Sequence, residues 1–386
     1  MTGFDPTQLR RWPDIESPEL QAHDGADLLL LDTALATGLL PGAAGSVAVV
    51  NDHYGALTLG ALHAGATGLR VHQDALSGER ALEANAGRTG AGTTGFSHDA
   101  LAPELVAGAR LVLVQLPRSL DALEEIADLV ARHADPGVVL LAAGRIKHMN
   151  LAMNDLLARY FENVSASRAA RKSRVLTAGV PRAAAQLPPR RFPLAAAHDV
   201  GGDRPLQLRA FGATFGGAKL DPGTRFLLPH LTGARSASTA VDLGCGNGTI
   251  ASYLARLRPG LRVLACDQSA SAVASTRATA EANGVQDRVD VVREDALGWL
   301  EDASQELVVL NPPFHVGNAV HAGIALKLIT DAGRVLAPGG ELWCVWNSHL
   351  AYRGQLERRV GPTRQVARNP KFTVTVSTRG SRADRP

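Results

Sequence analysis

Residues 241–248 read VDLGCGNG, and this stretch decides the fold. The apolar segment TAVDL (239–243) runs into glycines at positions 244, 246 and 248, and the helical pattern TIASYLARL follows from position 249. Glycine permits positive φ and lets a ligand approach the backbone where a Cβ would otherwise stand. The pattern therefore predicts a strand, a tight ligand-binding turn and a helix, as in an open α/β sheet.

Acidic residues near the ends of successive strands narrow the class of ligand. Thr249 stands where a dinucleotide fingerprint requires its last glycine, so the motif G-x-G-x-x-G is absent. Asp242 precedes the glycines, Asp267 ends the strand RVLACD, and Asp295 closes the segment RVDVVRED. Each acid alone could be a helix N-cap. Together they trace the carboxyl edge of a parallel sheet, where Asp267 could bind ribose hydroxyls and Asp295 an adenine amino group.

This combination of glycine loop and acids resembles the S-adenosylmethionine site of class I methyltransferases. The resemblance implies that S-adenosylmethionine is the cofactor, held by Asp242, Gly244, Cys245, Gly246, Asn247, Asp267, Gln268, Asp295, Ala296 and Asn311. The 3 cysteines form no CxxC pair, so we expect neither a metal site nor a disulfide framework.

The two halves of the chain are similar to one another. Strands alternate with helices through the C-terminal half, which is typical of a mostly parallel sheet covered on both faces. In the N-terminal half, SVAVVNDHYGAL (46–57) aligns with TAVDLGCGNGTI (239–250), and RLVLVQLPRS (110–119) aligns with ELVVLNPPFH (306–315). We predict an α/β protein of two tandem Rossmann-like class I methyltransferase domains. The first (1–185) is degenerate because it has lost the glycine loop, residues 186–204 form a linker, and 205–386 form the catalytic domain.

The tetrad Asn311, Pro312, Pro313 and Phe314 follows an apolar strand of the second copy. The exocyclic amine of a base is a poor nucleophile, because its lone pair is conjugated with the ring. Acceptors on both N–H groups, such as Asn311 Oδ1 and the Pro312 carbonyl, could orient that lone pair toward a methyl donor. Phe314 offers a stacking face, worth ~1–3 kcal/mol per base. The first copy ends its strand without this tetrad, so we predict that these four residues are catalytic.

The extended motif Asn-Pro-Pro-Phe-His resembles that of methyltransferases acting on guanine N2 in ribosomal RNA. The likeness covers essentially the whole chain, including NDHYGAL (51–57), LPRSLDALEEIADL (116–129) and WNSHLAYRGQL (346–356). These segments are similar to the large-subunit methyltransferase G family and less so to the small-subunit methyltransferase C family. The resemblance implies methylation of a specific guanine, with 23S favoured over 16S ribosomal RNA, and a segment 211–231 lying over the cofactor.

Charge is unevenly distributed along the chain. The formal net charge is only +3, yet residues 144–220 hold 13 lysines and arginines against 4 acids. Such a surplus favours a nucleic-acid partner, although solvated helix faces would give the same pattern. We expect RNA or substrate contacts from Arg171, Lys172, Arg174, Phe215 and His315. Phe215 could instead help to close the cofactor site or only pack in the core, and His315 could act as a base or only orient its loop.

The N-terminus has no apolar signal-like segment, so we expect a cytoplasmic monomer without a membrane partner. Three alternatives remain at this point. The same chemistry could act on DNA adenine N6 or on a protein glutamine. The chain could be a non-catalytic RNA-binding assembly factor. A small-molecule methyltransferase is also conceivable, but it would leave the basic surplus and the duplication unexplained.

Overall fold

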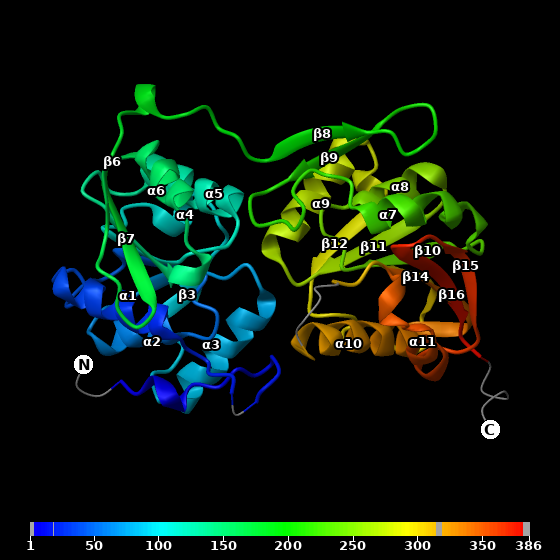
Figure 1. Ribbon diagram of the computed structural model, residues 1–386, viewed down its shortest axis with the longest axis horizontal. Coiled ribbons are helices and arrows are strands. Elements are labelled where there is room, and N and C mark those ends of the chain that lie inside the picture. The colour runs from blue at the N-terminus through cyan, green and yellow to red at the C-terminus, as the bar shows by residue number, and fades with distance from the viewer. Residues whose placement is uncertain (1–3, 18, 314–318, 381–386) are drawn as a thin grey trace. The chain divides into compact units, whose positions relative to one another are not determined.

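The computed structural model describes residues 4–17, 19–313 and 319–380. The chain forms two units, residues 1–192 and 193–386 (Figure 1). The first unit contains the helices α1 Gly25–Ala36, α2 Ala56–His63, α3 Leu76–Arg88, α4 Pro103–Val106, α5 Leu120–His133 and α6 Leu151–Ala158. Its strands are β1 Val47–Val50, β2 Leu69–His72, β3 Phe96–His98, β4 Leu111–Gln115, β5 Val139–Arg145, β6 Phe161–Ala166 and β7 Ser173–Pro181.

The second unit opens with a hairpin of β8 Leu194–His198 and β9 Leu206–Ala210. Its helices are α7 Pro222–Leu227, α8 Thr249–Leu257, α9 Ala270–Ala282, α10 Ala319–Val335 and α11 Arg353–Arg359. Its sheet is built from β10 Thr239–Leu243, β11 Arg262–Asp267, β12 Val289–Arg293, β13 Gln305–Leu310, β14 Leu336–Asn347, β15 Thr363–Arg368 and β16 Phe372–Thr378.

The two sheets have the same topology. Their strand orders are β3-β2-β1-β4-β5-β7-β6 and β12-β11-β10-β13-β14-β16-β15, with the first five strands parallel in each and an antiparallel pair at one side. The pairing registers also correspond, because Val50 pairs with Val114 where Leu243 pairs with Leu310. The predicted duplication is therefore confirmed, with Asn51 equivalent to Gly244 and Gln115 equivalent to Asn311.

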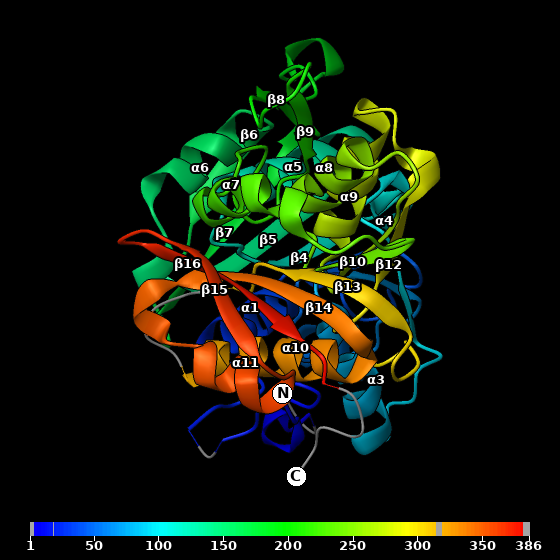
Figure 2. The ribbon, with the colours of Figure 1, turned by 90° about the vertical axis from the view of Figure 1, so that its right-hand side faces the viewer.

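Each sheet is buried on both faces, as the near-continuous apolar strands predict. In the first unit, Val47 and Val49 face a core shared with α1, α2 and α3, while Ala48 and Val50 face a core shared with α4, α5 and α6. In the second unit, α8 and α9 cover one face and α10 and α11 the other (Figure 2). The loops at the carboxyl ends of the parallel strands are thereby left to form the site.

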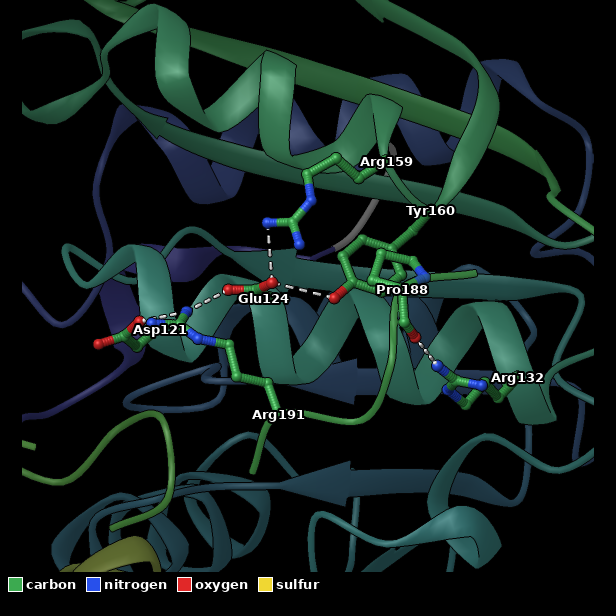
Figure 3. Close-up of polar contacts among 7 residues, drawn as sticks. All are labelled: Asp121, Glu124, Arg132, Arg159, Tyr160, Pro188 and Arg191. Carbon is green, nitrogen blue, oxygen red and sulfur yellow. Dashed lines mark hydrogen bonds and ion pairs between the residues drawn. The ribbon is translucent and has the colours of Figure 1, made fainter. Parts of the chain in front are cut away.

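The segment that leaves the first unit is fastened to α5 (Figure 3). Arg191 pairs with Asp121 at 2.8 Å and also with the buried carboxylate of Glu124, which accepts a 3.1 Å hydrogen bond from Tyr160. Arg132 donates to the carbonyl of Pro188. Of residues 186–204, expected as a linker, the first part thus packs on the first unit, and β8 within the same range pairs with β9 in the second unit.

Candidate active site

The glycine loop between β10 and α8 has room for a ligand. Gly244, Gly246 and Gly248 have φ values of +76°, +55° and +76°, a backbone region that favours glycine. A Cβ at Gly248 would lie 2.8 Å from Thr276 Cα, so this glycine allows α8 and α9 to pack closely. A Cβ at Gly244 or Gly246 would meet no protein atom within 4 Å. These two positions therefore leave the space that a nucleoside-like ligand would need against the backbone.

Asp242 is the penultimate residue of β10 and is completely buried next to this loop. Its Oδ2 accepts a 2.9 Å hydrogen bond from the N–H of Ala251 in the first turn of α8. Its Oδ1 is buried without a partner among the described residues. Burial raises the pKa of Asp242 to about 7, and the negative charge of Asp267 adds to this effect. An unpartnered buried acceptor is costly, so it fits a site that a polar or cationic ligand completes.

Asp267 stands at the end of β11, next to the loop. Its Oδ2 accepts from the N–H of Gly246 at 3.1 Å, and its Oδ1 accepts from the N–H of Ser269 at 3.0 Å. The N-cap of α9 is Ser269, whose hydroxyl accepts from the N–H of Ala272, so Asp267 does not serve as this helix's cap. The Oε1 of the neighbouring Gln268 is buried and has no partner in the described part of the chain. Asp267 therefore holds the loop and keeps a carboxylate at the sheet edge.

Asp295 and Ala296 lie beyond β12, as predicted. Asp295 forms an ion pair with Lys327 of α10 at 2.5 Å, which sequence reasoning did not identify. Ala296 is buried with a φ of +66°, and its carbonyl accepts from Cys266 Sγ at 3.2 Å and from Trp299 Nε1 at 3.3 Å. Lys327 holds the Asp295 carboxylate at this edge of the sheet. Cys245, another expected cofactor residue, is buried and its Sγ accepts from Thr276 at 3.2 Å.

The amide of Asn311 is oriented by two residues that lie 90 and 87 positions earlier in the chain. Asn311 Nδ2 donates to Asp221 Oδ1 and to Thr224 Oγ1, both at 2.9 Å. Because a carboxylate only accepts, Nδ2 must face Asp221, and Oδ1 points the other way. Pro312 is buried and Pro313 is exposed. The predicted Phe314 and His315 lie outside the described residues.

The segment 211–221 is attached to the glycine loop. Asn247 Nδ2 donates to the carbonyls of Gly217 and Lys219 at 2.9 and 3.0 Å. The segment ends at Asp221, which caps α7 through the N–H of Thr224, with Pro222 at the first helical position. Phe215 is 71% exposed on this segment. One chain segment thus connects the expected cofactor loop with Asn311. The sequence indicated that Asp221 and Pro222 begin a helix, but it gave no sign of the hydrogen bond between Asp221 and Asn311.

The predicted basic residues lie in the first unit, where Arg171 and Lys172 are in the turn between β6 and β7 and Arg174 is the second residue of β7. Arg171, Lys172 and Arg174 are exposed, but Arg171 pairs with Asp32 at 2.9 Å. Among residues 4–17, 19–313 and 319–380, no cluster of three His, Cys, Asp or Glu is placed to bind a metal ion. Over the same ranges, no helix combines the length and apolar character needed to cross a membrane.

Comparisons with known proteins agree with this geometry. Residues 206–376 match the family described as methyltransferase small domain, and residues 1–182 match the RLMG N-terminal domain. The fold is similar to that of a solved T. thermophilus 16S rRNA N2 G1207 methyltransferase in complex with AdoMet and guanosine. The TM-score is 0.74 at 23% identity, covering 95% of this chain and 97% of that chain.

The fold and the site define an S-adenosylmethionine-dependent class I methyltransferase. The chain is 36% identical to a ribosomal RNA large subunit methyltransferase G of Pseudomonas paraeruginosa, over 97% of both chains. It is 33% identical to one of Streptomyces avermitilis, over 95% of both. The chain therefore belongs to the ribosomal RNA large subunit methyltransferase G family.

Proposed function

We propose that this protein transfers a methyl group from S-adenosylmethionine to the exocyclic N2 of a specific guanine in large-subunit (23S) ribosomal RNA. The observation that carries the proposal is the fixed amide of Asn311 at the end of β13, on the sheet edge that also carries the glycine loop and Asp267. The names of the relatives support the RNA substrate.

The second unit supplies the cofactor site. The open backbone at Gly244 and Gly246, the unpartnered Asp242 Oδ1 and the Asp267 carboxylate fit a nucleoside that carries a cationic group. Asn247, Cys245, Gln268, Asp295 and Ala296 would complete the walls. When bound, S-adenosylmethionine supplies an electrophilic methyl group on its sulfonium sulfur.

The nucleophile is prepared by hydrogen-bond acceptors of the chain. Asn311 Oδ1 and the carbonyl of Pro312 would each accept one N–H of the guanine amine, which directs the nitrogen lone pair at the incoming methyl. Asp221 and Thr224 keep Asn311 from turning its Nδ2 toward the amine. No charged base is required, because the alkylated nitrogen is acidic enough to release its proton to water.

The first unit would hold the RNA rather than the cofactor, because its equivalent loop carries side chains at the ligand positions. A guanine inside a duplex would have to be unstacked before it reached Asn311. We propose a monomer that acts in the cytoplasm.

The test is to map N2-methylguanosine in ribosomal RNA from a strain that lacks the gene, and to restore it in vitro with the purified protein and tritiated methyl donor. We expect one guanine of 23S RNA to lose its methyl group in the strain and to regain it in vitro. Label in 16S RNA, DNA or protein, or in no macromolecule, would contradict the proposal. Label in DNA or protein would favour the adenine or glutamine alternative.

A further inference from the structure

One face of α10 fastens the loop that follows β12. Lys327, Asp331 and Arg334 are spaced by four and three residues, so their side chains lie on the same side of this helix. Asp331 Oδ2 accepts from the N–H of Leu297 at 3.0 Å. Arg334 donates to the carbonyls of Leu297 and Leu300 at 2.6 and 2.8 Å. Asp331 and Arg334 therefore hold the backbone of the loop.

Lys327 differs from these two residues because it contacts a side chain of the loop. Its Nζ lies 2.5 Å from Asp295 Oδ2, and the Asp295 side chain is only 18% exposed. Within the described part of the chain, Asp295 Oδ1 makes no hydrogen bond. Each carboxylate oxygen can accept hydrogen bonds. Lys327 thus fixes the carboxylate through one oxygen and leaves the other oxygen available to a ligand.

The Asp295 carboxylate lies next to the strand end that carries Asp267. Asp267 at the end of β11 is the pairing partner of Arg293 at the end of β12, and the N–H of Glu294 donates to the Asp267 carbonyl at 3.0 Å. Neighbouring strands are only about 4.8 Å apart. A nucleoside whose ribose binds Asp267 can therefore reach Asp295 with its base.

We propose that Lys327 is a positioning residue for the adenine of S-adenosylmethionine. It holds Asp295 with Oδ1 free to accept from the 6-amino group, and in this way it makes the site prefer a 6-amino purine to a 6-oxo purine. An ionised carboxylate only accepts, and so does a 6-oxo group, so the two oxygens would face each other without a proton between them. The inference rests on the cofactor site of the proposed function and is independent of the RNA substrate.

The test is isothermal titration calorimetry of the full-length protein with S-adenosylhomocysteine and with its 6-oxo analogue, S-inosylhomocysteine. Neither ligand has a sulfonium charge that the charge of a lysine could repel. Wild type should prefer the 6-amino ligand by about 10–100-fold, the usual value of a hydrogen bond to a charged group. Lys327→Met should reduce this preference about threefold to tenfold, because the carboxylate must then be ordered when the ligand binds. Lys327→Arg should restore most of the preference.

The matched control breaks an ion pair that joins the same two strands at their opposite ends. Arg262, the first residue of β11, pairs with Asp290 of β12 at 3.1 Å. Arg262→Met should leave both affinities unchanged. Thermal unfolding should show that this variant and Lys327→Met remain folded, since exposed ion pairs contribute only about 0–1 kcal/mol to stability and Asp331 and Arg334 still hold the loop.

A double variant shows whether Lys327 acts through Asp295. Asp295→Ala should remove the preference for the 6-amino ligand, and adding Lys327→Met to it should cause no further change in either affinity. An unchanged preference in Lys327→Met would overturn the inference. Equal losses of affinity for the two ligands would also overturn it, because they would assign Lys327 to loop structure alone, and so would a wild-type protein without any preference.

No RNA is present in these measurements, so the inference and the proposed function fail separately. A protein that shows the expected preference but methylates no guanine would refute only the proposed RNA substrate.

Discussion

After the first strand of the second unit the turn carries Gly244, Gly246 and Gly248, and in the first unit the equivalent positions carry Asn51, His53 and Gly55. The φ values in the first unit are +63°, +56° and +98°, so the backbone is left-handed at the same three places in both turns. The first copy has lost two of the three glycines but has kept the left-handed backbone path of the turn. Side chains now project where the second unit leaves room for a ligand.

Hydrogen bonds of the two turns also correspond. In the second unit Asp267 accepts from the N–H of Gly246, and in the first unit Gln73 Oε1 accepts from the N–H of His53 at 2.9 Å. Gln73 Nε2 donates to the carbonyls of His53 and Gly78 in its own unit, each at 3.3 Å. Both units therefore have the hydrogen bond from the turn to the end of the next strand. The first unit has a neutral amide, Gln73, where the second unit has the Asp267 carboxylate that could bind a ribose.

The amide of Asn311, which we propose is catalytic, has a counterpart of the same kind in the first unit. Gln115 Nε2 donates to Asp27 Oδ1 at 2.8 Å, and Asp27 is the third residue of α1, as Thr224 is of α7. Gln115 Oε1 is buried without a partner among the described residues, although Gln115 and Asn311 are both only partly buried as whole residues. The two copies therefore share the backbone path and the hydrogen bonds of the site, and they differ in its charge and in the open space at the turn.

The largest expected effect follows from replacing the amide in each copy. Asn311→Ala should lower kcat about 10²–10³-fold, because it removes one preorganised hydrogen-bonding group from the transition state. Gln115→Ala should leave methyl transfer unchanged. Single-turnover assays with tritiated S-adenosylmethionine measure both. Equal losses in the two variants would show that the copies do not differ in the way proposed.

The next test replaces Asp267 of the second copy with glutamine, the residue type that the first copy has at the equivalent position. Asp267→Gln should keep the turn folded, because Gln73 already accepts the equivalent N–H. It should weaken S-adenosylmethionine binding about 10–100-fold, the usual cost of losing hydrogen bonds to a charged group. Calorimetry measures the affinity, and circular dichroism checks the fold. Unchanged affinity would leave Asp267 with only its role in holding the loop.

Two buried carboxylates, Asp242 in the second unit and Asp52 in the first, should each make stability depend on pH, over different pH ranges. The pKa of Asp242 is raised to about 7 by burial, and that of Asp52, which accepts from the N–H groups of Leu57 and Thr58, to about 6. The folded state then binds a proton that the unfolded chain releases near pH 4, so stability falls as pH rises through this window. Between pH 5 and 7 the raised pKa of Asp242 should lower the free energy of unfolding by about 2 kcal/mol.

Asp242→Asn should abolish this loss, which would appear as a growing stability advantage over wild type in urea unfolding as the pH rises. For Asp52→Asn the corresponding advantage should level off one pH unit earlier. If the difference between Asp242→Asn and wild type stayed constant across pH 5–7, the carboxyl would not be protonated in the folded protein.

A smaller effect should separate positioning from helix capping at Asp221. Asp221→Ser keeps an N-cap for α7 but is too short to hold Asn311, so kcat should fall about tenfold with little change in unfolding midpoint. Asp221→Asn retains both a cap and an acceptor, and should recover most of the rate. Parallel losses of rate and stability in the Ser variant would assign Asp221 to capping alone.

Much of this site could be predicted because its signals are local. A few adjacent residues are enough to indicate the glycine loop, the strand ends near Asp242 and Asp267, and the Asn-Pro-Pro break. The similarity of the two halves in addition predicted two sheets of the same topology. Contacts between distant segments gave no such signal. Asp221 bonds to Asn311 across 90 positions, and Arg171 bonds to Asp32 across 139. The second contact partly neutralises the charge of Arg171. Strand β8 was expected as linker because the stretch around it is rich in Pro, Gly and Arg.

The left-handed turn of the first unit also has an evolutionary consequence. His53 adopts a conformation that costs roughly 1–2 kcal/mol for a residue with a Cβ. His53→Gly should therefore raise the stability of this unit by about 0.5–1 kcal/mol, after the entropy of glycine is subtracted, and chemical denaturation would measure it. A decrease would mean that the His53 side chain has gained stabilising contacts of its own. The turn thus keeps the left-handed backbone of a glycine loop, although side chains now fill the place where the second unit leaves room for a ligand.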